Sequence, residues 1–406
     1  MKTFFIIGGY TFLNPGDEAI LKATVYRMQR LWPDCRFLIW ADRKDFSLAF
    51  DRPVNYAIAP FKPLPFLGGG GPFTGFVRGV YRRLFPKSFG LLRDGLGHGR
   101  GLVRVMGGAD FIVFIGGGYL NSYYNLIEMH YLYGLAKQSG KPVYLLGQTI
   151  GPFFRAQDRR IAESICAGAE RIVVREEYSA LEMKQFSEKM VEGTDDAVGF
   201  GANGKGREDV MLAPYVGRGA EGALLLGLNL HKIGRPGERL YQDLVARLNQ
   251  FGDSLGGRKL KVVFLPMETS IYCDDSDEGR KLTTAPDKRF EYVTVDADLT
   301  VEQRVAVVAH MDLFVGMRFH SLVFAVSHAV PCVGLYHGDY YFRKVNGLLK
   351  AFGEERLSIS LEHLELLPGL LSELYRDSAA HKARIRSSFE NVMARQDRIY
   401  RDIFAS

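Results

Sequence analysis

Short apolar runs recur along this chain, and most of them end in a glycine-rich or charged loop that leads into a helical pattern. Residues 3–7 (TFFII), 36–40 (RFLIW) and 111–115 (FIVFI) are examples. Near-continuous apolar runs of this length are typical of parallel strands that helices cover on both faces. The alternation therefore predicts an α/β protein built from doubly wound sheets.

Two series of such units follow one another, and the polar, glycine-rich segment 193–206 separates them as an interdomain linker. The length of 406 residues also indicates more than one domain. We expect one Rossmann-like domain over residues 1–200, a second over 201–370, and charged helices over 371–406 that pack back on the lobes. Two α/β domains that face a cleft and are closed by C-terminal helices make up a GT-B-like architecture.

Charge and cysteine content narrow the partners and the compartment. A net charge of +6 is mildly basic, which suits an anionic substrate or membrane surface but is too weak and dispersed for nucleic acid. The four cysteines show no paired spacing, as expected for free thiols in a reducing compartment. The N-terminal apolar run stops at Gly8-Gly9 and reads as a strand rather than a signal peptide. We therefore expect a cytoplasmic protein.

Residues 60–105 differ from the rest of the first domain, because they combine glycine and phenylalanine with many arginines and only one acidic residue, Asp94. One interpretation is an insertion that packs on the domain. The other is a basic, aromatic surface that contacts anionic lipid head groups or an anionic acceptor, peripherally on the inner membrane face.

Several candidate site residues follow predicted strands, at the sheet edge where open α/β proteins bind ligands. In the first domain the loops after the strands carry glycines and polar side chains, namely Gly8, Gly9, Asn14, Asp17, Gly117, Gly118, Gln148 and Arg175. In the second domain, Arg318 and His320 follow the apolar run 313–315. The alternative for the last two is a helix-capping arginine beside a buried histidine, and spacing alone does not decide between these interpretations.

Six segments together resemble the polysaccharide pyruvyl transferases. They are GGYTFLNPGDEAIL, GGGYL, GKPVYLLGQTIGP, VREEYSALEM, GMRFHSLVFA and FRKVNGLLKAFG, and they span most of the chain from Ile7 to about Gly353. The resemblance implies a GT-B-like fold and transfer of pyruvate from phosphoenolpyruvate onto two hydroxyls of a sugar, in a cell-surface polysaccharide or its lipid-linked precursor. Two departures stand out: Asn14-Pro15-Gly16 in the opening loop, and a long segment rich in Phe and Arg from Phe61 to Arg104.

The resemblance also assigns roles to residues at matching positions. It implies that Arg318 and Arg175 hold the carboxylate and phosphate of phosphoenolpyruvate, that Lys344 neutralises the leaving phosphate, and that His320 is the general acid/base. Arginine suits both oxyanions, and histidine can carry a proton near neutral pH. Arg343 is the alternative to Lys344, and an ion pair with Glu176 or Glu177 is the alternative role of Arg175.

The remaining loops, with Gly8, Gly9, Asn14, Asp17, Gly117, Gly118 and Gln148, are expected on the acceptor side. Adjacent acids at Asp274 and Asp275 are more often solvated or capping than metal ligands, and we expect neither metal nor cofactor. Two other functions stay open: a GT-B glycosyltransferase that uses a nucleotide sugar, and a non-catalytic glycan-binding protein.

Overall fold

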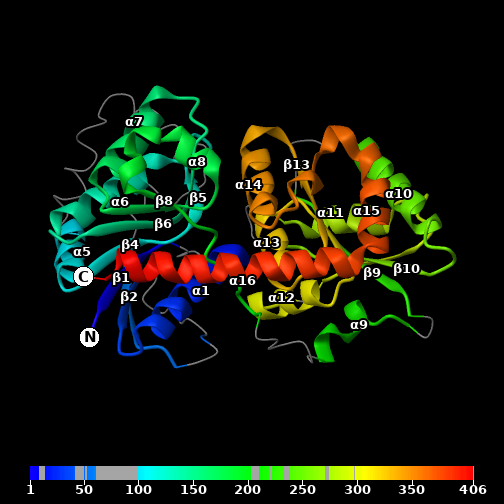
Figure 1. Cartoon of the computed structure of the whole chain (residues 1–406), viewed down its shortest axis with the longest axis horizontal. Coiled ribbons are helices and arrows are strands. Elements are labelled where there is room, and N and C mark those ends of the chain that lie inside the picture. Colours follow the sequence, from blue (N-terminus) through cyan, green and yellow to red (C-terminus); the bar gives the residue numbers. More distant parts are fainter. Residues whose placement is uncertain are drawn as a thin grey trace. The chain divides into compact units, whose positions relative to one another are not determined.

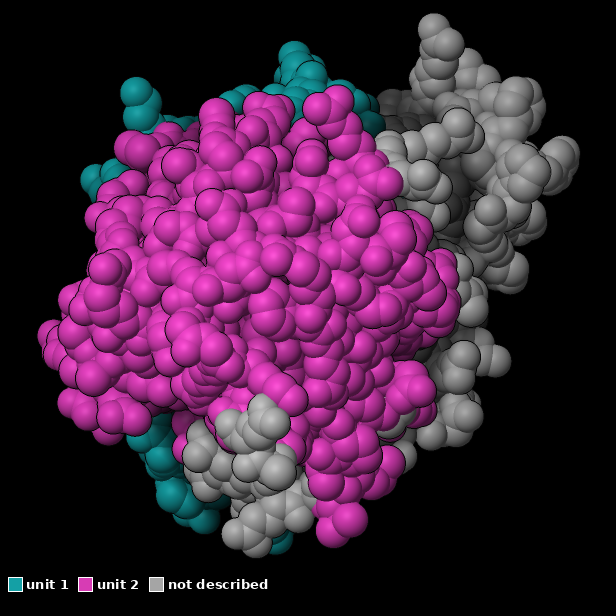
Figure 2. Space-filling model, turned by 90° about the vertical axis from the view of Figure 1, so that its right-hand side faces the viewer, with its two compact units in different colours: residues 1–11, 25–173, 183–191 teal, residues 12–24, 174–182, 192–406 magenta. Residues whose placement is uncertain are grey.

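The computed structural model describes residues 1–8, 14–41, 50, 53–60, 98–202, 210–219, 222–231, 238–269, 274–296 and 298–405. It divides into two compact units, coloured separately in Figure 2. Unit 1 comprises residues 1–11, 25–173 and 183–191, and unit 2 comprises 12–24, 174–182 and 192–406. This differs from the boundary expected at residue 200, because the chain exchanges segments between the two units before that point.

Among the described residues, the sheet of the first half follows the order β3-β2-β1-β4-β6-β7-β8, with β5 paired to β6. Its strands are β1 (Thr3–Ile7), β2 (Arg36–Ala41), β3 (Tyr56–Pro60), β4 (Phe111–Phe114), β5 (Gly117–Leu120), β6 (Val143–Ile150), β7 (Arg171–Val174) and β8 (Met190–Glu192). The central pairs β1–β2, β1–β4 and β4–β6 are parallel. The order 3-2-1-4 at its centre is that of a Rossmann-like sheet.

The sheet of unit 2 follows the order β11-β10-β9-β12-β13-β14, and each of its pairs is parallel. Its strands are β9 (Leu224–Asn229), β10 (Leu260–Phe264), β11 (Glu291–Thr294), β12 (Leu313–Gly316), β13 (Cys332–Tyr336) and β14 (Ser358–Ser360). In sequence order within the sheet this is 3-2-1-4-5-6, the Rossmann order. Strands β9, β10 and β12 are buried along their whole length, which explains why they are apolar except for Asn229 in β9 and Lys261 in β10.

Helices connect the strands in both halves (Figure 1). They are α1 (Pro15–Leu31), α5 (His98–Gly107), α6 (Leu126–Gln138), α7 (Ala156–Gly168), α8 (Glu177–Glu182), α9 (Ala213–Val216), α10 (Glu238–Asp253), α11 (Ser276–Thr283), α12 (Val301–Ala309), α13 (Phe319–Ser327), α14 (Gly338–Ala351), α15 (Leu367–Arg376) and α16 (Ser378–Ile403), with short 3₁₀ turns between some of them. The described residues include no helix with the length and apolar character needed to cross a membrane.

Three expectations for the chain need correction or qualification. Strands β3, β5 and β8 were not predicted, because they are short and β5 begins with the glycines expected in a loop. The segment 193–206 is no solvated linker at its start, since Thr194, Asp195 and Asp196 are all buried. Of the basic segment 60–105, residues 61–97 lie outside the described residues, and its end forms α5.

Candidate functional site

Five charged or titratable side chains from separate parts of the chain come together within unit 2. We call this group the charged cluster; it consists of Asp17, Arg175, Asp195, His320 and Lys344. Asp17 lies in the first turn of α1, Arg175 directly follows β7, and Lys344 lies in α14. Arg175, His320 and Lys344, which the sequence singled out as a donor site, therefore do lie together.

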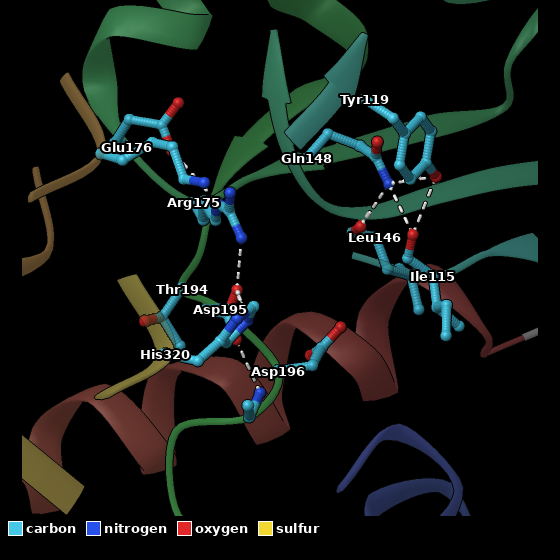
Figure 3. A network of polar contacts seen from close by, with 12 residues as sticks. Ile115, Tyr119, Leu146, Gln148, Arg175, Glu176, Thr194, Asp195, Asp196 and His320 are labelled. Atoms are coloured by element: carbon cyan, nitrogen blue, oxygen red, sulfur yellow. Dashed lines mark hydrogen bonds and ion pairs between the residues drawn. The ribbon is translucent and has the colours of Figure 1, made fainter. Parts of the chain in front are cut away.

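Within the charged cluster, Asp195 contacts both Arg175 and His320 (Figure 3). Its Oδ2 is 2.5 Å from Nη1 of Arg175 and 3.8 Å from Nε2 of His320. Its Oδ1 accepts a hydrogen bond of 2.9 Å from the backbone N–H of Ala197. Burial acts to raise the pKa of Asp195, but the polar contact and charge of His320 and the charge of Arg175 outweigh it and hold that pKa below its ordinary range. The carboxylate is therefore ionised at neutral pH.

Arg175 is held on two sides. Its guanidinium also lies 3.7 Å from Oε2 of Glu176, and its central carbon is 4.3 Å from the ring centroid of Phe319. The residue is 5% exposed. The ion pair between Arg175 and Glu176, which was the alternative to a functional role, is therefore present. It occurs together with the contact between Arg175 and Asp195.

Lys344 is the second cation of the charged cluster. Its Nζ is 5.0 Å from the ring centroid of Phe319 and 4.9 Å from that of Tyr340. Burial, followed by repulsion from Arg175, lowers the pKa of Lys344 to about 7. Arg343, in contrast, is bound by Glu182 at 2.9 Å and Asp339 at 2.8 Å. Of these neighbouring cations, only Lys344 belongs to the charged cluster.

His320 packs against the start of α1. A Cβ atom built on Gly16 would lie 1.9 Å from Nδ1 of His320, so only glycine fits there. The Nε2 side of the ring differs, because that nitrogen has no hydrogen-bond partner among the described residues. The helix start is fixed by Asn14, whose side-chain oxygen accepts a 2.8 Å hydrogen bond from the N–H of Gly16. The ring is therefore held through one edge, and the other edge is available for proton transfer.

Asp17 joins the charged cluster through the same helix start. Burial raises the pKa of Asp17, although the charges of His320, Lys344 and Arg175 oppose this shift. Asp17 was expected on the acceptor side, but it lies beside Arg175 and Lys344, which were expected to bind the donor, and beside His320, the expected general acid/base.

Arg318 lies in a different set of contacts. Its Nε and Nη2 bind the two carboxylate oxygens of Asp275 at 3.1 and 2.7 Å, and its Nη1 lies 2.9 Å from Glu268. Its backbone N–H donates a 2.9 Å hydrogen bond to the side chain of Asn229. Asp275 also accepts hydrogen bonds from the N–H groups of Met267 and Glu268. These contacts fix the turn between β12 and α13, which carries His320.

Asn14, like Asp17, lies in unit 2. The other described acceptor-side candidates lie in unit 1, where Gln148 organises the loop after β4. Its Nε2 donates to the carbonyls of Leu146 at 2.7 Å and Ile115 at 2.9 Å, and lies 3.0 Å from the hydroxyl of Tyr119 (Figure 3). The remaining loop candidates are glycines: Gly8, with φ of 120°, packs on Ile115, Gly117 packs on Tyr119, and the carbonyl of Gly118 accepts a hydrogen bond from Asn121. Gly9 lies outside the described residues. The amide nitrogen of Gln148 thus serves the loop itself.

Asp195 is the residue that the sequence interpretation missed. It was assigned to a linker because its surroundings are rich in glycine and polar residues. The available signal was its position four residues after the short apolar run Met190–Val191, because the end of a strand is where α/β proteins place ligand-binding groups.

Comparison with known proteins supports the same family as the sequence motifs. The model of the family described as polysaccharide pyruvyl transferase matches residues 14–340. Among solved structures, HepE from Anabaena in complex with UDP and glucose is 12% identical, with a TM-score of 0.58 over 100% of both chains. The UDP-GlcNAc 2-epimerase from Neisseria meningitidis is 9% identical, with a TM-score of 0.59 and the same coverage. At such identities the likeness shows the fold alone, which is GT-B-like with two Rossmann-like α/β sheets. The family match covers most of the chain, and the protein belongs to the polysaccharide pyruvyl transferase family.

Proposed function

We propose that the protein transfers pyruvate from phosphoenolpyruvate onto two hydroxyls of a sugar, forming a pyruvate ketal and releasing phosphate. The observation that carries this proposal is the convergence of Arg175, Lys344 and His320 within one unit. Phosphoenolpyruvate carries a phosphate and a carboxylate, and two cations beside a proton donor suit such a molecule. The acceptor is a glycan or a lipid-linked saccharide.

The reaction consists of two additions. In the first, one sugar hydroxyl attacks C2 of phosphoenolpyruvate, C3 gains a proton from Nε2 of His320 to become a methyl group, and the proton of the hydroxyl passes back to His320. In the second, the other hydroxyl displaces phosphate from C2 and its proton leaves with the phosphate. Arg175 and Lys344 stabilise the carboxylate and the departing phosphate, and no metal or cofactor takes part in this scheme.

Arg318 has a supporting role in this proposal. Its guanidinium is held by the carboxylates of Asp275 and Glu268, so we assign it to the turn that presents His320 instead of to the donor. For the acceptor side we keep the loops of unit 1 that carry Gly117, Gly118 and Gln148. Attachment to the inner face of a membrane through residues 60–105 would suit a lipid-linked acceptor in the cytoplasm.

Binding of the anionic donor should favour the charged form of Lys344. At pH 8 most of the Lys344 amines are neutral, because the pKa is about 7. Binding of an anion favours the ammonium form, so binding at this pH takes up protons from solution.

The proposal is tested by phosphate release from phosphoenolpyruvate in the presence of candidate glycans. We expect His320→Ala to abolish release and leave the melting temperature within a few degrees of the parent protein. His363→Ala is the matched control, because His363 is exposed and its imidazole contacts the neighbouring Glu365. Full activity of His320→Ala would rule out the assigned role.

A glycosyltransferase that uses a nucleotide sugar is the second candidate, favoured by the fold shared with HepE, which has been crystallised with UDP-glucose. Thermal-shift measurements separate the two candidates, because only a ligand that binds the native protein raises its melting temperature. We expect phosphoenolpyruvate to raise it and UDP-glucose to leave it unchanged; the reverse result would favour the glycosyltransferase. A response to glycan alone, without phosphate release, would indicate a binding protein.

A further inference from the structure

Two adjacent buried aspartates follow β8, and they have entirely different partners. Asp195 contacts Arg175 and His320, whereas Asp196 accepts hydrogen bonds from Gln396 at 2.9 Å and Tyr400 at 2.7 Å. We propose that Asp195 is a positioning residue, whose carboxylate holds the donor-binding cation Arg175 and sets a negative charge beside the imidazole of His320. This inference rests on the function proposed above.

The carboxylate of Asp195 is held in one orientation. Its Oδ1 is fixed by the N–H of Ala197 at 2.9 Å, and the residue is 1% exposed, so the carboxylate cannot turn toward solvent. Its Oδ2 faces Arg175 and His320 at the same time. A displacement of Arg175 by the donor is therefore transmitted to the carboxylate beside the imidazole.

The separation between Oδ2 of Asp195 and Nε2 of His320 leaves the N–H of His320 available to the substrate, which a short hydrogen bond would not. At 3.8 Å, Oδ2 attracts a positively charged imidazole without occupying the N–H of Nε2. That proton stays available for the methylene carbon of the donor. A carboxylate in direct hydrogen bond would compete with the substrate for the same proton.

The other charges around His320 make this carboxylate necessary. The charged groups around His320 are Asp17 from α1, Arg175 after β7, Asp195, and Lys344 from α14. Arg175 and Lys344 disfavour a third positive charge. Asp17 has a raised pKa, so it is a weaker source of compensating charge than Asp195, whose pKa lies below its ordinary range.

Asp195→Asn tests the inference, because the amide keeps the size of the side chain and an oxygen for Ala197 but removes the negative charge. We expect kcat to fall by roughly 10²- to 10⁴-fold, the range that general acid–base catalysis contributes, with a much smaller change in KM for phosphoenolpyruvate. The alkaline limb of the pH profile of kcat should also move to lower pH. Asp196→Asn is the matched control: it lowers the melting temperature but leaves the pH profile in place.

A measurement that needs no turnover separates failure of this inference from failure of the proposed function. The imidazole resonance of His320, assigned by its absence in His320→Gln, is titrated by NMR in the parent protein and in Asp195→Asn. We expect its protonation midpoint to move to lower pH in Asp195→Asn and not in Asp196→Asn. An unchanged midpoint in a folded Asp195→Asn protein would overturn the positioning role, whatever the reaction is. A shifted midpoint with no phosphate release from phosphoenolpyruvate in the parent protein would overturn only the proposed substrate.

Discussion

Replacement of Gly16 by alanine should damage both the stability and the activity of this protein. The added Cβ would lie 1.9 Å from Nδ1 and 2.3 Å from Cγ of His320, far inside the 3.4 Å at which ordinary van der Waals contact begins. In a helix with free space, glycine to alanine gains up to about 1 kcal/mol. Overpacking costs about 1–3 kcal/mol, so we expect the two effects to combine to a net loss of roughly 1–2 kcal/mol.

Gly369 provides the matched control. Both glycines follow a proline in the first turn of a helix of unit 2, Gly16 in α1 and Gly369 in α15. A Cβ on Gly369 would meet nothing within 4 Å, and the backbone there has no positive φ. Gly369→Ala should therefore gain a few tenths of a kcal/mol to about 1 kcal/mol and keep full activity.

Denaturant unfolding gives the stabilities of the two variants, and phosphate release gives their activities. A shift of the reacting group by about 1 Å can cost about 10²-fold in rate, so Gly16→Ala should lose most of its kcat even where it is fully folded. If Gly16→Ala matched Gly369→Ala in both measurements, the packing of His320 against α1 would be refuted.

Further predictions concern the cations. Lys344→Met should abolish activity yet stabilise the fold by about 1 kcal/mol below pH 7, because a buried charge is replaced by an apolar chain of similar size. The pKa of Lys344 is about 7 in the folded protein and near its ordinary value in the unfolded chain. The unfolded chain therefore holds more protons above pH 7, so the parent protein gains stability as pH rises and the advantage of Lys344→Met shrinks. Unfolding midpoints of both proteins at pH 6 and pH 9 check this sign. Arg318→Ala should destabilise by about 3 kcal/mol, since it leaves the carboxylate of Asp275, which is 0% exposed, without its cation. If Arg318 holds the turn instead of the donor, Arg318→Ala and Asp275→Ala lower kcat alike and their effects do not add; an increase in KM for phosphoenolpyruvate confined to Arg318→Ala would contradict this role.

The fold could be predicted because most strands and helices have a recognisable local pattern in the sequence. Parallel strands that are buried on both faces are almost wholly apolar, so runs such as Phe111–Phe114 and Leu313–Val315 can be recognised in the sequence. The same rule fails for β5 and β8, because a short strand at the edge of a loop needs no apolar run. The family is likewise legible in the sequence, because its motifs follow the strands in a fixed order.

The site could be predicted only in part, because tertiary contacts decide which side chains enter it. Strand ends indicated Arg175 and His320, since a sheet brings the carboxyl ends of its strands to one edge. Sequence spacing could not tell Lys344 from Arg343, because adjacent residues on a helix point in different directions: one enters the charged cluster and the other binds Glu182 and Asp339. For the same reason it could not show that the side chain of Arg318 turns toward Asp275.

Asp195 shows most clearly what the tertiary structure decides. In the sequence it is one of two adjacent acids in a glycine-rich segment, and nothing distinguishes it from Asp196. In the folded chain, Asp195 faces Arg175 and His320, while Asp196 faces α16. Whether a buried carboxylate serves the chemistry or the packing depends on which distant side chains surround it, and residues 20, 125 and 204 positions away meet these two only when the chain is folded.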